Sequence, residues 1–300
     1  MSSALVQELV DSGIHFGHRV SRWNPKMLPY IFGKRNLIHI IDLRETVKGL
    51  LRAKRFIART VSEGGDVLFV GTKRQARHSV MDHARQCGMP FVTERWLGGT
   101  LTNFRTVRAR LGRLEELEAE ETSGKLQEYS KKAIAMRTRE RIKIKRNLDG
   151  IRTLHKLPAA LIVIDVQREH IAVKEARSLG IPTVCLIDTD SDPDYADIPI
   201  PGNDDAIRSI EIVLKHLAEA IETGKRSRPA KPVEEKEGRG DAGQRRRSRR
   251  VTARADGAEG APAGDDSGEA SGATATATAE SPEPAPAPAE QRPAESEDKS

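Results

Sequence analysis

The stretch that decides the fold runs from residue 160 to residue 187 and reads ALIVIDVQREHIAVKEARSLGIPTVCLI. It begins and ends with apolar runs rich in β-branched residues, Ala160–Ile164 and Thr183–Ile187, and a helical pattern lies between them. Asp165 supplies turn chemistry after the first run, and Gly180 ends the helix before the second run. A strand, a helix and a second strand in this order predict a parallel pair covered by its crossover helix.

The same alternation extends in both directions from this unit. Further short apolar runs occur at residues 37–41, 67–70, 91–92 and 198–200, and helical spacings separate most of them. A final helix is expected from about residue 204 to 223, with Asn203 as N-cap and Gly224 as its end. The sequence therefore predicts an α/β fold on a doubly wound parallel sheet, an αβα sandwich of the Rossmann or flavodoxin type.

Residues 103–155 interrupt this alternation, because they contain no strand candidate. Two long helical patterns lie here, separated by the turn Thr122-Ser123-Gly124. Their apolar side chains recur at spacings of three and four residues, as at Leu111 and Leu114, and such spacing forms a narrow seam. We expect an antiparallel coiled-coil helical hairpin inserted into the α/β domain.

The last part of the chain has a different composition. Residues 226–300 contain no Leu, Ile, Phe, Trp or Tyr. Such a segment cannot bury enough apolar surface to offset a backbone ordering entropy of about 1–2 kcal/mol per residue. We expect one folded domain over residues 1–225 and a disordered low-complexity tail over 226–300, basic at 226–254 and acidic at 255–300.

The charge balance indicates a polyanionic partner. The chain has 50 Lys and Arg against 44 Asp and Glu, a net charge of +6, and residues 1–225 alone carry +8. The second helix of the expected hairpin has eight basic residues against Glu140 between residues 129 and 146. Charged flanks of a coiled coil usually carry both signs, so this imbalance favours a surface that faces phosphates.

Cysteine usage and hydropathy indicate a cytoplasmic protein. Cys87 and Cys185 form no CxxC pair, which argues against a disulfide framework and a thiolate zinc finger. Stretches of about 18 apolar residues, as a membrane-spanning helix needs, do not occur. We therefore expect no membrane partner.

Two motifs suggest ligand sites but fail on spacing. Gly71-Thr72-Lys73 follows a strand, yet it lacks the upstream glycine of a phosphate-binding P-loop. Residues 188–192 alternate carboxylates like a calcium loop, but Pro193 and Pro199 stand where that loop needs Gly and Glu. No sequence signature of a catalytic nucleophile is found, so we assign no active site.

A weaker candidate is a metal site at His18. Asp188 and Asp205 would have to fold back onto this histidine to complete a set of ligands for zinc or magnesium. Because the sequence fixes no third ligand, a structural hydrogen-bonding histidine is favoured and no cofactor is assigned.

Two loops interleave basic residues with tryptophan. The first contains Arg19, Arg22, Trp23 and Lys26, and the second contains Arg95-Trp96 followed by small residues. Cations neutralise phosphates, and indole or guanidinium planes stack on unpaired bases, so these loops favour RNA binding. The alternative for both tryptophans, anchoring of the loops in the core, stays open.

Several ordered motifs are recognisable together. HFGH at residues 15–18, WNPKM at 23–27, RWLGGTLTNF at 95–104 and the run at 200–206 resemble the bacterial form of the small-subunit ribosomal protein S2 family. The resemblance covers about residues 3–224. It implies a non-catalytic component of the 30S ribosomal subunit, bound to 16S rRNA at the head–body junction. It also implies contacts with neighbouring small-subunit proteins, including the large mRNA-binding one that it helps to hold, and no small-molecule substrate.

The expected contribution of this chain is positioning through many phosphate contacts rather than base recognition. The residues that we expect at RNA are Arg19, Arg22, Trp23, Lys26, Lys73, Arg74, Arg95, Trp96, Arg105, Arg108, Lys131, Lys132, Arg137 and Arg141. One alternative is an α/β enzyme for a nucleotide or phosphosugar, with Asp165 and Asp188 at strand ends. Another is a free RNA chaperone that works through its basic tail, which the basic folded body disfavours.

Overall fold

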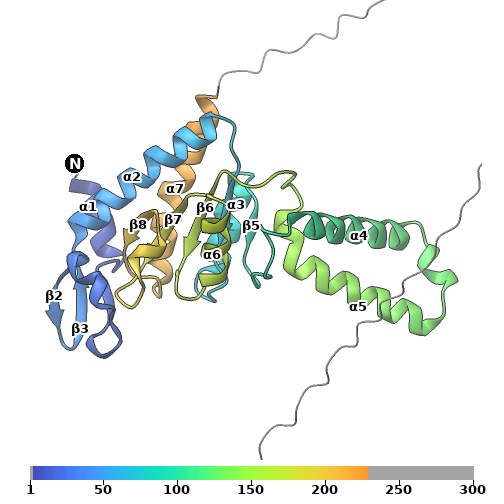
Figure 1. Ribbon diagram of the computed structural model, residues 1–300, viewed down its shortest axis with the longest axis horizontal. Helices are drawn as coiled ribbons and strands as arrows, with labels where there is room; N and C mark the ends of the chain where they lie inside the picture. The colour runs from blue at the N-terminus through green and yellow to red at the C-terminus, as the bar shows by residue number, and fades with distance from the viewer. Residues whose placement is uncertain (1–2, 229–300) are drawn as a thin grey trace, which may run out of the picture. The chain divides into compact units, whose positions relative to one another are not determined.

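The main element of the fold is a five-stranded parallel sheet (Figure 1), which a computed structural model places within residues 3–228, the part of the chain that the structure describes. Its strand order is β5-β4-β6-β7-β8. The strands are β4 (Val67–Val70), β5 (Phe91–Val92), β6 (Ala160–Ile164), β7 (Thr183–Ile187) and β8 (Ile198–Pro201). The predicted α/β class with a parallel sheet is confirmed. The predicted tail lies outside the described residues from residue 229 onward.

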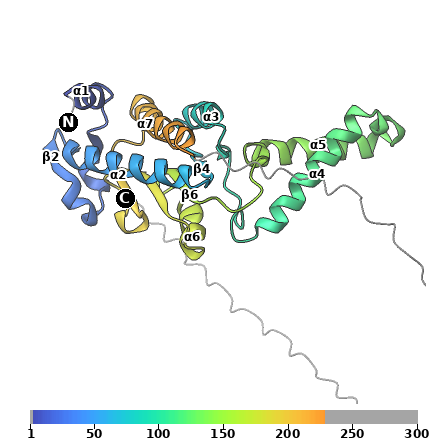
Figure 2. The same ribbon diagram turned by 90° about the horizontal axis from the view of Figure 1, so that it is seen from above.

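Helices cover both faces of this sheet (Figure 2). One face carries Val67, Phe69 and Ile162 and packs against α1 (Ser3–Asp11), α2 (Leu43–Ser62), α3 (Arg77–Gln86) and α7 (Ile207–Arg226). The other face carries Leu68 and Leu161 and packs against α6 (His170–Ser178). Because both faces are buried, the central strands are apolar at almost every position, as the sequence pattern indicated. Within residues 3–228, none of the helices is both long and apolar enough to cross a membrane.

A second, antiparallel sheet lies near the N-terminus. It consists of β1 (Phe16–Arg19), β2 (Ile31–Arg35) and β3 (Ile38–Ile41) in the order β1-β3-β2. The apolar run at 37–41 therefore does not join the parallel sheet, as the alternation suggested, because β1 and β2 pair with it on both sides. The turn between β2 and β3 places Asn36 and Leu37 in the left-handed region, at φ 49° and 61°.

The segment between β5 and β6 is helical. Helix α4 (Phe104–Thr122) and helix α5 (Lys131–Leu148) lie beside each other and run in opposite directions (Figure 1). Gly124 adopts φ 75° in the turn between them, a backbone conformation that a glycine adopts without strain. Short 3-10 helices occur at Val20–Arg22, Pro25–Tyr30, Lys125–Glu128, Asp149–Ile151 and Pro193–Tyr195.

The last helix differs from its predicted bounds at both ends. Asn203 accepts hydrogen bonds from the backbone N–H groups of Asp205 and Ala206, before the first residue of α7. Gly224 does not end the helix, which continues to Arg226. A Cβ at Gly224 would lie 2.6 Å from the carbonyl oxygen of Ala58 in α2, so the glycine permits the close packing of these two helices.

Candidate functional site

Charged side chains gather where the strand order changes direction, between β4 and β6, which is the usual place for ligands in open α/β sheets. Lys73 follows β4 and is only 9% exposed. Its ammonium nitrogen lies 2.7 Å from Oδ1 of Asp204, 2.6 Å from Oδ1 of Asp205 and 3.3 Å from Oδ2 of Asp165. We call these residues, with His18 and Asp188, the strand-end cluster.

The electrostatics of the cluster keep Lys73 charged. Burial alone would lower the pKa of Lys73, but the charge of Asp204 and the hydrogen bonds to Asp204 and Asp205 raise it overall. Asp165 has φ 69°, a conformation that costs about 1–3 kcal/mol for a residue with a side chain. The ammonium of Lys73 therefore offsets part of the negative charge of the three carboxylates, and a strained backbone holds one of them, Asp165, in place.

His18 connects the cluster to strand β1. Its Nδ1 lies 3.0 Å from Oδ2 of Asp188 and its Nε2 lies 3.3 Å from Oδ2 of Asp205. The hydrogen bond to Asp188 makes the largest contribution to a pKa of His18 that is raised to about 9. The structure thus brings together the three metal candidates expected from the sequence, His18, Asp188 and Asp205. It also adds Asp204, whose carboxylate lies within 4.8 Å of the ligand atoms of His18 and Asp188.

The raised pKa of His18 predicts a pH dependence of stability. A group with a higher pKa in the folded state than the ordinary 6.5 stabilises the fold fully below 6.5, and this stabilisation is lost as the pH rises through about 9. Its size is on the order of 2–3 kcal/mol. We expect the difference in unfolding free energy between wild type and His18→Asn to shrink steadily from pH 6.5 to 9.5 in urea titrations. A constant difference would contradict this assignment, and His78→Asn, at an exposed position, is the control.

A buried carboxylate shapes the loop that precedes α4. Glu175 of α6 accepts hydrogen bonds from Nε1 of Trp96 at 3.1 Å and from the backbone N–H groups of Gly99, Leu101 and Thr102 at 2.8, 2.9 and 3.1 Å. These bonds lower the pKa of Glu175 although its burial acts in the opposite direction. Trp96 is 6% exposed, so its indole anchors the loop in the core, which is the alternative that the sequence left open.

The residues expected at RNA fall into three groups. Of the residues expected at RNA, seven are exposed cations that form no ion pair within the described part of the chain: Arg19, Arg22, Arg74, Arg95, Arg105, Lys131 and Lys132. Cations that are bound within the protein are Lys26, on Asp192 and Asp194, Lys73 in the strand-end cluster, and Arg108, on the carbonyls of Arg152 and Leu154. Trp23 is half-buried, with its ring 5.1 Å from that of His39.

The third group lies on α5 and pairs with acidic residues of α4. Arg137 binds Glu120, and Nη1 of Arg141 lies 2.7 Å from Oε2 of Glu121. Lys145, which was not among the residues expected at RNA, follows the same pattern, with its Nζ 3.6 Å from Oε1 of Glu118. The excess of positive charge on α5 is thus partly balanced across the hairpin. Pairing between helices could not be read from the composition of α5 alone.

Sequence reasoning missed an apolar surface on the antiparallel sheet. Phe32 and Leu37 are each 79% exposed, and Phe16 is 46% exposed. Phe32 also lines a cavity of about 350 Å³ with His15, Ile40 and other residues of β3 and the start of α2. The sequence did contain a sign of these apolar residues, because the run YIFGKRNLI at residues 30–38 has them on both sides of a turn. Nothing in the run indicated that their side chains stay exposed.

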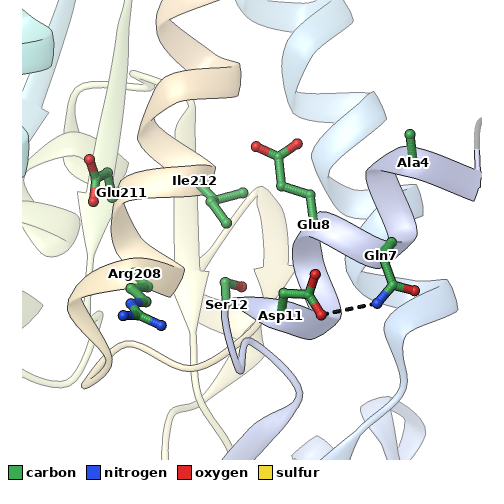
Figure 3. A pocket seen from close by; sticks show the side chains of 8 residues that line it. All are labelled: Ala4, Gln7, Glu8, Asp11, Ser12, Arg208, Glu211 and Ile212. Carbon is green, nitrogen blue, oxygen red and sulfur yellow. Dashed lines mark hydrogen bonds between the residues drawn. The ribbon is translucent and has the colours of Figure 1, made fainter.

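Another surface cavity lies between α1 and the first turns of α7 (Figure 3). It has a volume of about 600 Å³, and the charged residues that line it are Glu8, Asp11, Arg208 and Glu211. The amide of Gln7 donates a 3.0 Å hydrogen bond to Asp11 within it. It shares no residue with the strand-end cluster.

The fold and the charges together define a class of protein, a basic α/β domain that carries exposed cations without ion pairs, within the described residues, on its loops and on a helical insertion as well as on its helices. The chain belongs to the ribosomal protein S2 family, whose pattern it matches over residues 9–224. It is 56% identical to the small ribosomal subunit protein uS2 of Rhodopirellula baltica over 225 residues, which is 75% of this chain and 86% of that protein. It is 53% identical to the protein of the same name from Mycobacterium ulcerans over 228 residues, 76% of this chain and 83% of that protein.

Proposed function

We propose that the chain is a structural, non-enzymatic constituent of the small ribosomal subunit that binds 16S rRNA. Membership of the ribosomal protein S2 family carries this proposal. The exposed and unpaired arginines, among them Arg19, Arg22, Arg95 and Arg105, support it as contacts that neutralise phosphates. The enzyme alternative is not favoured, since the relatives are named as ribosomal proteins and the strand-end carboxylates Asp188 and Asp204 already pair with His18 and Lys73.

The finer arrangement is part of the same proposal. Residues 1–225 are the part that binds the cytoplasmic 30S subunit, at the junction of head and body. Helices α4 and α5 form a coiled coil in this arrangement. The buried seam of Leu111, Leu114 and Leu117 against Ile144 and Leu148 supports it, since coiled coils need such a seam.

Neighbouring small-subunit proteins, including the large mRNA-binding one, are proposed as further partners. The exposed side chains of Phe16, Phe32 and Leu37 support a protein contact. Apolar side chains gain nothing from phosphates, whereas exposed apolar surface is typical of the sites where proteins contact one another.

Sedimentation of cell lysate through sucrose gradients tests the proposed function. We expect this chain in the 30S fractions at about one copy per particle, together with the mRNA-binding protein. Its release should increase with salt, because six to ten phosphate contacts on a duplex weaken binding by roughly 10³–10⁵-fold between about 50 and 200 mM salt. Recovery at the top of the gradient even at low salt would refute the proposal and would redirect attention to nucleotide ligands.

A further inference from the structure

The cations of α5 occupy two opposite sides of the helix. A helix turns by about 100° per residue, so Arg137, Arg141 and Lys145 lie on one side, the side that pairs with α4. Lys132, Arg139, Lys143 and Arg146 lie on the other side, along about 21 Å of helix. Among residues 3–228, only Arg146 of this second set forms an ion pair, with Glu94. The second set is therefore a solvent-facing stripe of positive charge.

This stripe forms one wall of a groove where the hairpin joins the domain. Two surface cavities of about 440 and 490 Å³ both contain Arg139, Lys143 and Asn147 in their linings, so we treat them as one groove. Arg95 and Arg146 line the first cavity, and Arg110 of α4 lines the second. Arg95, Arg110, Arg139 and Lys143 are all exposed and have no ion pair within the described part of the chain.

The two carboxylates of the groove do not cancel this charge. Glu94 is held between Arg77 and Arg146, and Oε1 of Glu140 lies 4.0 Å from Nε of Arg113. Five cations against two carboxylates leave the lining with a net charge of +3. The cations also come from three separate elements, the loop that Glu175 holds, α4 and α5, so the folded chain places them together.

We propose that this groove binds one strand of RNA backbone, with Arg139 and Lys143 as its main phosphate contacts. The inference rests on the proposed function and specifies which face of the hairpin carries it. A guanidinium donates two parallel hydrogen bonds to a phosphate, and an ammonium acts as a point charge, so the pair holds a strand without reading its bases. Arg137 and Arg141 belong to the hairpin itself, because their charges already bind α4. An acidic protein segment is the competing occupant, but it would need more apolar anchoring than the exposed Ile142 offers.

The matched test uses two double variants of the full chain with equal charge and equal spacing. Arg139→Gln/Lys143→Gln removes the groove cations, and Arg137→Gln/Arg141→Gln removes the cations that face α4. Each variant is added to small subunits stripped of this protein, and its affinity is measured over a series of salt concentrations. Affinity for 16S rRNA freed of protein is measured in the same way, and thermal unfolding is recorded for both.

We expect the groove variant to unfold like wild type but to bind RNA at least roughly tenfold more weakly near 0.1 M salt. The plot of the logarithm of its binding constant against the logarithm of the salt concentration should be less steep than that of wild type, by about 1.5. The other variant should keep the wild-type slope and unfold at a lower temperature. An unchanged slope for the groove variant, while wild type still binds, would overturn the inference and leave the proposed function intact. Weaker binding to subunits but not to free rRNA would also overturn it, in favour of an acidic protein.

Discussion

Replacing Lys73 with methionine is expected to lower the free energy of unfolding by about 3–5 kcal/mol, the range found when one partner of a buried ion pair is removed. The ammonium balances Asp204, which is 1% exposed, together with Asp165 and Asp205. Without it, the buried carboxylate of Asp204 loses its counter-ion in a place where water cannot replace it. At 2–4 °C per kcal/mol for a domain of this size, the melting temperature should fall by roughly 6–20 °C.

The control for this prediction is Lys26→Met. Lys26 also binds two aspartates, Asp192 and Asp194, but at the surface, where solvent replaces the lost partner. Thermal unfolding followed by circular dichroism should show a large decrease for the first variant and no resolved change for the second. The loss in the Lys73 variant should also become smaller at acidic pH, as the stranded carboxylates take up protons. Equal decreases in melting temperature for the two variants would show that burial of the strand-end cluster contributes little to stability.

The second large decrease in the free energy of unfolding is expected for Glu175→Ala. The variant leaves the indole N–H of Trp96 and the backbone N–H groups of Gly99, Leu101 and Thr102 without their acceptor. Each buried donor without a partner costs about 1–3 kcal/mol, and partial access of water to the loop brings the total to about 3–5 kcal/mol. Glu175→Gln should recover only part of this, since one of its two oxygens is replaced by a competing donor.

Tryptophan fluorescence and urea unfolding check this prediction. The emission of Trp96 should shift to longer wavelength as water reaches the loosened loop, and the urea midpoint should fall. Lys174→Ala is the matched control, because Lys174 is exposed on the same helix and touches none of these donors. A stable variant with unchanged emission would mean that the loop holds its shape without the carboxylate.

The parallel sheet was readable from sequence because its strands are buried on both faces. Val67–Val70, Ala160–Ile164 and Thr183–Ile187 are apolar at almost every position, and no surface helix produces that pattern over so short a run. The antiparallel sheet was not readable in the same way. Strand β1 has the sequence FGHR, which is too short and too mixed to show an alternation, and its pairing with β3 depends on tertiary structure.

The site was predictable in its residue types but not in its pairings. Lys73 and Asp204 are 131 residues apart, so no spacing rule could join them. The same holds for Glu175, which looks like an ordinary helix carboxylate until the loop 76 residues upstream folds onto it. The cations of the hairpin were all visible, but which of them are neutralised depends on the side of each helix that faces its neighbour.

The two ends of the hairpin are joined by hydrogen bonds from Arg108, and this joint affects how the chain folds. Strands β4 and β6 pair Val67 with Ala160, so a long stretch of chain must be looped out before the centre of the sheet forms. Helices α4 and α5 contact each other over short sequence separations, and Arg108 donates hydrogen bonds to the carbonyls of Arg152 and Leu154 at 3.2 and 3.3 Å. A hairpin that forms first brings these two ends together, so the loop that remains to be closed is effectively shorter. Early formation of the inserted helices therefore lowers the loop-closure entropy cost of pairing β4 with β6.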